Sequence, residues 1–344
     1  MNAHSFCMIR GGWDWRGFAF VAACAAALLV AREAAARTIA AEDTLDPPAA
    51  SSDAVQQRLD RLGYEAGAFD VTTEPHAGSA FDTVVRFPSP VRTGEPAIDT
   101  VVLEWRQARR DGERLAEPVP AVVVLHSVQP RLVVGRSIAY QLSQRGLHAL
   151  VLHLPGYGGR LPEGQRWTPV GAIERGEQAA GDARRAFDAV AALPGVDRDR
   201  VSLMGVSLGG FVAATAAALE PDVWHRVWLV ASGADIATVL ADGKRDAARV
   251  ARWLSHAGYT GESLRELIEP LDPAPLLHRL HADRTHLVRP VFDRVIPKGS
   301  YELLIDKAEL PEANVHELPA NHYTMLLLLP RLLDTVIDAA GQPR

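Results

Sequence analysis

The sequence predicts an α/β fold in which helices cover both faces of a mostly parallel central sheet. Strand-like apolar runs alternate with longer helical patterns from residue 121 to the C-terminus, and this alternation is typical of parallel sheets. The composition agrees, because 344 residues with 48% hydrophobic and 23% charged side chains can form one large core. We therefore expect one folded domain.

The expected elements follow in chain order. Residues 81–87 and 100–106 are two strand-like runs joined by a loop rich in proline and glycine, which predicts an antiparallel pair ahead of the alternating part. Further strands are expected at residues 121–125, 149–152, 201–204, 227–230, 287–292 and 314–317, and helices at 135–145, 172–193, 209–219, 300–308 and from Tyr323 onward. Residues 235–280 interrupt the alternation with a largely helical insertion, which predicts a small helical cap.

The first 36 residues have the layout of a signal peptide. Arg10 and Arg16 precede the apolar run 17–31, and three alanines at 34–36 follow it. The run is shorter than the ~20 residues that span a bilayer. We therefore expect an exported protein, periplasmic or secreted, with no stable membrane span after processing. Lipidation at Cys24 is the alternative, because residues 21–24 resemble a lipoprotein cleavage box.

The remaining chain divides into two parts. Residues 37–80 carry no strong core pattern and are expected to form an N-terminal arm or linker, and residues 81–344 are expected to form the domain. Both cysteines, Cys7 and Cys24, fall in the leader. The mature chain would have no thiol, which excludes disulfides, cysteine nucleophiles and cysteine zinc sites.

The net charge and the spacing of the histidines indicate which ligands are not expected. The formal net charge is −6 at pH 7, so no nucleic-acid partner is expected. His278, His281 and His286 lie close in sequence, but no carboxylate completes the spacing of a known metallohydrolase. We expect neither a metal nor another cofactor.

A serine between glycines is the strongest local signal. Ser207 lies in Gly-Val-Ser-Leu-Gly, between the apolar run 201–204 and the Ala-rich helix expected at 209–219. A sharp strand-to-helix turn would expose the hydroxyl beside the N-terminus of the helix, where an anion is stabilised. The alternative is that Ser207 only caps the helix.

Residues from about 81 to the C-terminus resemble the α/β-hydrolase superfamily, and are most similar to dienelactone-hydrolase-like and related esterase members. The stretch "GDARRAFDAVAALPGVDRDRVSLMGVSLGG" carries the resemblance. The resemblance implies the α/β-hydrolase fold, a serine nucleophile, and partners in the chain order serine, acid, histidine.

Two residues downstream of Ser207 fit these partner positions. His322 follows the strand expected at 314–317 and precedes the last helix, as the catalytic histidine of the superfamily does. Asp293 follows the strand expected at 287–292 and opens "DRVIP", which resembles the segment that carries the acid in many members. Asp235, after the preceding strand, is the reserve acid, since some hydrolases use that position.

The resemblance also implies an oxyanion hole. One N–H would come from Leu208, the residue after the nucleophile, and the other from Val128 in the loop that follows the strand 121–125. The sequence thus predicts a serine hydrolase that cleaves a small-molecule ester or related acyl substrate through an acyl-enzyme. A catalytically silent binding protein remains an alternative, as does a peptidase or acyltransferase of this fold. Ester hydrolysis is favoured over peptidase activity because no propeller-like domain precedes the catalytic part.

Overall fold

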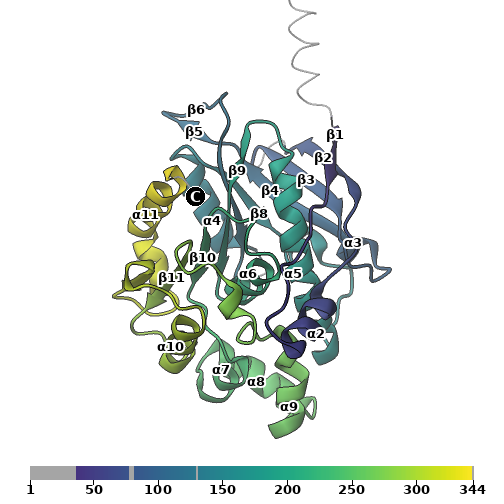
Figure 1. Ribbon diagram of the computed structural model, residues 1–344, viewed down its shortest axis with the longest axis vertical. Helices are drawn as coiled ribbons and strands as arrows, with labels where there is room; N and C mark the ends of the chain where they lie inside the picture. The colour runs from purple at the N-terminus through teal and green to yellow at the C-terminus, as the bar shows by residue number, and fades with distance from the viewer. Residues whose placement is uncertain (1–35, 77–80, 129–130, 343–344) are drawn as a thin grey trace, which may run out of the picture.

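The computed structural model describes residues 36–76, 81–128 and 131–342, and a ten-stranded sheet forms its centre (Figure 1). The strand order is β1-β2-β3-β4-β8-β7-β9-β10-β11-β12. The strands are β1 (Arg37–Glu42), β2 (Ala68–Pro75), β3 (Thr83–Pro88), β4 (Thr100–Arg106), β7 (Val119–Leu125), β8 (His148–Leu152), β9 (Val196–Val206), β10 (Val227–Val230), β11 (Thr285–Pro290) and β12 (Val315–Leu318). A separate hairpin joins β5 (Arg109–Arg110) to β6 (Glu113–Arg114).

The sheet has an antiparallel part and a parallel part. Strands β1 to β4 pair antiparallel with one another, and β4 pairs antiparallel with β8. The six strands from β8 to β12 in the sheet order run parallel. The chain moves from β7 to β8 on one side and later to β9 on the other side of β7. Such a reversal leaves a crevice beyond the carboxyl ends of the strands, where ligands bind in open α/β sheets.

Helices cover both faces of the sheet, as the sequence predicts. One face packs against α2 (Asp53–Leu62), α5 (Pro169–Ala191), α6 (Leu208–Leu219) and α10 (Lys298–Lys307), and the other against α4 (Val133–Ser143) and α11 (Leu329–Gly341). Successive side chains of a strand point to opposite faces. In β7 this alternation places Val123 in one hydrophobic cluster and Val124 in the other, each fully buried.

The expectation of an N-terminal arm or linker over residues 37–80 needs correction. Strands β1 and β2 extend the sheet beyond β3, and α2 lies between these two strands in the sequence. The segment is anchored by Phe69 and Val71, which are buried in the core. β1 is at the edge of the sheet and β2 buries only alternate positions, so the apolar content of both is low and the pattern is weak in the sequence.

The insertion after β10 is helical. It contains α7 (Ile236–Asp242), α8 (Asp246–His256), α9 (Gly261–Ile268) and two short 3-10 turns, η2 (Glu269–Leu271) and η3 (Leu277–Arg279). Helices α7, α8 and α9 lie together at the lower end of the view in Figure 1. Their buried side chains meet those of the beginning of α5 in a small cluster of their own. We refer to α7, α8 and α9 as the cap.

The predicted signal peptide, including Cys24, falls outside the described residues except for Ala36. Export and cleavage therefore stay predictions. Among the helices of the described ranges, none is both long enough and apolar enough to cross a membrane.

Candidate active site

Ser207 stands at the turn between β9 and α6. Its backbone has φ 53° and ψ −114°, a region that residues with a Cβ rarely adopt. The Ser207 N–H donates to the carbonyl of Val230 at 2.8 Å, which fixes the turn to the neighbouring strand β10. Strain of this kind persists where surrounding contacts impose it, and it concentrates at functional sites.

The glycines of the motif permit close packing around this turn. A Cβ on Gly205 would lie 2.1 Å from the carbonyl oxygen of Gly209, and a Cβ on Gly209 would lie 2.4 Å from that of Leu125. A Cβ on Gly210 would lie 2.3 Å from the Cβ of Ser232. The glycines therefore let α6 begin directly against β9 and β7, while Ser207 itself carries the unusual φ.

His322 connects Ser207 to Asp293. Its Nε2 lies 3.0 Å from Ser207 Oγ, and its Nδ1 lies 2.8 Å from Asp293 Oδ2. The carboxylate can only accept, so Nδ1 donates to it and Nε2 is left to accept from the serine hydroxyl. The histidine is buried in the loop after β12, where the side chain of Asn321 accepts from the N–H groups of Tyr323 and Thr324, each at 3.0 Å.

Asp293 follows β11 and is held by four hydrogen bonds. Oδ1 accepts from the N–H groups of Val295 (2.7 Å) and Ile296 (3.1 Å), and Oδ2 accepts from His322 and from the Tyr301 hydroxyl (2.6 Å). Burial alone would raise the pKa of this carboxyl. The hydrogen bonds and the nearby His322 outweigh burial and hold the pKa of Asp293 below its usual value.

The sequence does not reveal the contact of Tyr301. This tyrosine is buried on α10, and burial together with the neighbouring carboxylate raises the pKa of its hydroxyl well above 10. The Tyr301 hydroxyl therefore keeps its proton at neutral pH and donates to Asp293. No motif marks the position, because only tertiary packing brings α10 against the loop after β11.

The reserve acid lies elsewhere. Asp235 caps α7, where its side chain accepts from the backbone N–H of Thr238 at 3.1 Å and from its hydroxyl at 2.5 Å. Of the two candidate acids, Asp293 is thus the one that contacts His322.

The two residues predicted to form the oxyanion hole lie next to Ser207. Leu208 is the first residue of α6, where N–H groups have no acceptor within the helix. Val128 follows β7, and both residues line the same cavity as Ser207. The loop that carries Val128 is fixed by His126, which donates from Nδ1 to Ser127 O (2.7 Å) and accepts at Nε2 from Leu154 N–H (3.1 Å). Burial lowers the pKa of His126 to about 4, so the ring is neutral.

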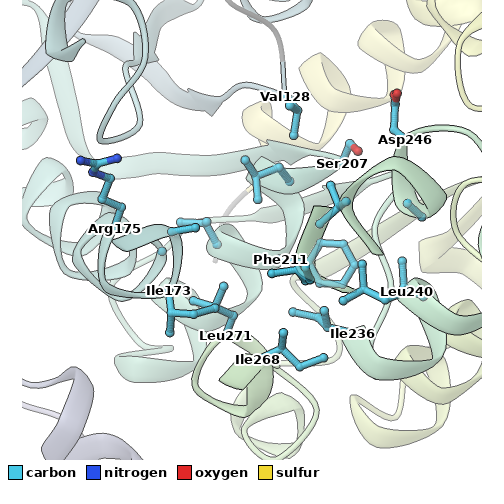
Figure 2. Close-up of a pocket in the computed structure, with 18 of the residues that line it drawn as sticks. Val128, Ile173, Arg175, Ser207, Phe211, Ile236, Leu240, Asp246, Ile268 and Leu271 are labelled. Atoms are coloured by element: carbon cyan, nitrogen blue, oxygen red, sulfur yellow. The ribbon is translucent and has the colours of Figure 1, made fainter. Parts of the chain in front are cut away.

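The cavity beside Ser207 has a volume of about 570 Å³. Its walls come from the beginning of α5, from α6, from the cap, and from loops at the carboxyl ends of the strands. Figure 2 shows Ser207 and Val128 at one end and Ile268 and Leu271 farther away, with Phe211 between them. Apolar side chains form most of the wall.

The three histidines considered as metal ligands have separate partners. The pairs are His278 with Ser51 (2.9 Å), His281 with Asp222 (2.7 Å) and His286 with His316 (3.3 Å). The structure therefore does not bring these histidines together.

A family model and several solved structures are similar to this chain. The model of the prolyl oligopeptidase family matches residues 134–278, which include Ser207 and the cap. Two acetyl xylan esterases have similar structures, one from Paenibacillus sp. R4 (TM-score 0.60, 17% identity, 85% of this chain and 96% of that one) and one from Thermoanaerobacterium sp. JW/SL YS485 (0.61, 17%, 87% and 96%). The chain has the α/β-hydrolase fold.

A structure described as a peptidase is also similar to this chain. A putative dipeptidyl aminopeptidase IV from Bacteroides ovatus ATCC 8483 gives a TM-score of 0.51 at 13% identity, over 79% of this chain and 41% of that one. No curated protein sequence matches. The α/β-hydrolase fold expected from the sequence is confirmed. Esterases and peptidases both occur among the similar proteins.

Proposed function

We propose that this protein is a serine hydrolase that cleaves carboxylic esters with Ser207 as nucleophile, His322 as base and Asp293 as the acid of the triad. The observation that carries the proposal is the unbroken hydrogen-bonded chain from Ser207 Oγ through His322 to Asp293, at 3.0 and 2.8 Å. A binding protein on the same fold would have no need to maintain both contacts.

The geometry supports acyl transfer in two steps. Ser207 Oγ attacks the ester carbonyl carbon while His322 Nε2 takes the hydroxyl proton, and the N–H groups of Leu208 and Val128 would donate to the oxyanion. His322 then gives the proton to the alcohol as the C–O bond breaks, which leaves the acyl group on Ser207. Water, deprotonated by His322, attacks the acyl-enzyme and releases the carboxylic acid and the free serine.

Asp293 supports both steps. Its carboxylate fixes the Nδ1–H tautomer of His322 and stabilises the imidazolium that forms when the ring takes a proton. Because the pKa of Asp293 lies below its usual value, the group is ionised throughout the neutral range.

An ester is favoured over a peptide by the character of the cavity. A peptide presents backbone N–H and C=O groups that need partners when buried, whereas the cavity wall is mostly apolar. Peptide hydrolysis is the second candidate, because the prolyl oligopeptidase family model matches residues 134–278. An ester and an anilide with the same acyl group separate the two activities.

Labelling with a fluorophosphonate probe tests the proposal. The probe should modify the wild type and Ser255→Ala, a control at an exposed serine of α8, but not Ser207→Ala. Hydrolysis of p-nitrophenyl esters by Ser207→Ala should fall by about a million-fold. A wild type that is neither labelled nor active, or equal labelling of Ser207→Ala, would overturn the proposal and favour the silent binding protein.

A further inference from the structure

We propose that the cavity beside Ser207 binds the acyl part of the substrate and that this acyl part is a large apolar group, such as a medium or long fatty acyl chain. The inference rests on the ester hydrolysis proposed above and adds the substrate class. It depends on three properties of the cavity: its size, the chemistry of its wall, and its position relative to His322.

The cavity is far larger than a short acyl group requires. A cavity of ~150 Å³ is enough to hold a benzene ring, and this one measures about 570 Å³. An acetyl group on Ser207 would leave most of that volume without contacts. The wall includes aliphatic or aromatic side chains from α5, α6, the cap and η2, namely Ile173, Phe211, Leu240, Leu254, Ile268 and Leu271.

Three charged side chains belong to the wall and have partners at the rim, but Arg175 Nη1 is buried without a hydrogen-bond partner in the described part of the chain. Asp246 and Arg249 of α8 pair with each other at 2.8 Å. The guanidinium of Arg175 stacks over the Trp167 ring at 4.7 Å and donates to the side chain of Gln165 at 3.0 Å. Figure 2 shows the charged ends of Arg175 and Asp246 on the outer side of the apolar side chains. A sugar or a charged acyl group would lose its hydration in this interior, where Arg175 Nη1 is the single unpartnered side-chain nitrogen or oxygen that the described wall residues leave buried.

The position of the cavity assigns it to the acyl group. The leaving alcohol must lie at His322 Nε2, because this atom supplies its proton. Ser207, Leu208 and Val128 are part of the cavity wall, whereas neither His322 nor Tyr323 is among the described residues that line it. A group that fills the cavity therefore extends from the carbonyl on the side of Ser207 away from the histidine. This is the acyl side of the ester.

Two ester series test the inference with the wild-type protein. In the first, p-nitrophenyl esters increase in acyl length from acetate to laurate. In the second, acetate esters increase in alcohol length over the same range. Each buried methylene contributes ~0.8 kcal/mol, which corresponds to roughly four-fold in kcat/KM. We expect kcat/KM to rise by at least about a hundred-fold from acetate to octanoate and to stay nearly flat in the alcohol series.

A substitution at the far end of the cavity sharpens the test. Leu271 contacts α5 so closely that a Cβ on Gly176 would lie 2.4 Å from its Cδ2, so a larger side chain at 271 must occupy the cavity. Leu271→Trp should lower kcat/KM for laurate at least ten-fold and leave that for butyrate within two-fold. Leu271→Ala should keep the preference for long chains.

The outcomes separate the two proposals. Preference for acetate over octanoate, or dependence on alcohol length alone, overturns the acyl assignment while ester hydrolysis stands. Inactivity toward every ester together with absent fluorophosphonate labelling overturns the proposed function itself. If Leu271→Trp does not fold, the wild-type series still decides the acyl assignment.

Discussion

The catalytic residues and the cavity beside them are held by different forces. Ser207, His322 and Asp293 stand at strand ends, and hydrogen bonds from backbone and side chains fix each of them. The cavity is enclosed by α5 and the helices of the cap. The buried side chains of these helices meet through apolar contacts. Hydrogen bonds fix direction as well as distance, whereas apolar packing fixes only volume. We therefore expect substitutions in the first region to change turnover and those in the second to change substrate choice.

The largest effect in the catalytic region, after loss of Ser207 itself, is expected for Asp293→Asn. An amide at this position would present a donor or a neutral acceptor to His322 Nδ1, so the tautomer and the charge stabilisation are lost. We expect kcat to fall by about 10⁴-fold with little change in the circular dichroism spectrum. Steady-state kinetics on one p-nitrophenyl ester measure this fall.

Asp235→Asn provides the matched control. The same chemical change at the cap of α7 removes no contact of His322, so kcat should stay within about three-fold of the wild type. A loss of comparable size in both variants would contradict the assignment of Asp293 as the acid.

A smaller effect is expected for Tyr301→Phe. The variant removes one donor from Asp293 Oδ2, so the pKa of Asp293 should rise toward its ordinary value of 3.8. The carboxylate, with one donor fewer, holds protonated His322 more tightly, and the acidic limb of the kcat/KM profile should move to higher pH. A profile that coincides with that of the wild type would show that Tyr301 has no positioning role.

Stability gives a second measurement for Tyr301→Phe. A carboxyl group with a depressed pKa stabilises the fold above its unfolded-state pKa and loses this contribution as the pH falls through the folded-state value. The variant should therefore lose about 1 to 3 kcal/mol at pH 7 and less near pH 3, as judged by urea unfolding. An equal loss at both pH values would point to packing as the cause.

The smallest effect is expected where the two regions meet. The Tyr323 hydroxyl donates to Asp246 Oδ2 at 2.9 Å and so links the loop of His322 to the cap. Both side chains are partly exposed, so Tyr323→Phe should cost no more than about 1 kcal/mol. We expect KM to change up to about three-fold with kcat unchanged. A ten-fold loss of kcat would show that docking of the cap controls the catalytic residues.

Local patterns in the sequence predict the parts of the site that lie at strand ends. Ser207, Asp293 and His322 each follow an apolar run, and parallel strands bring such positions to one edge of the sheet. The contact of Tyr301 could not be predicted, because it depends on how α10 packs. The cavity could not be predicted either, since its wall combines residues from separate segments whose side-chain directions are set by tertiary structure.

The contacts between the segment that follows β1 and α5 limit how far the predicted N-terminal cleavage could extend. Asp43 pairs with Arg185 at 2.6 Å, and the side chain of Thr44 accepts from Arg184 and donates to Asp188, at 3.0 and 2.8 Å. Both arginines are buried, so a chain trimmed past residue 43 would leave Arg185 without its carboxylate, and breaking a buried pair in this way costs about 3 to 5 kcal/mol. Cleavage after Ala36 preserves these ties, whereas proteolysis only a few residues later would expose the protein to unfolding from its edge.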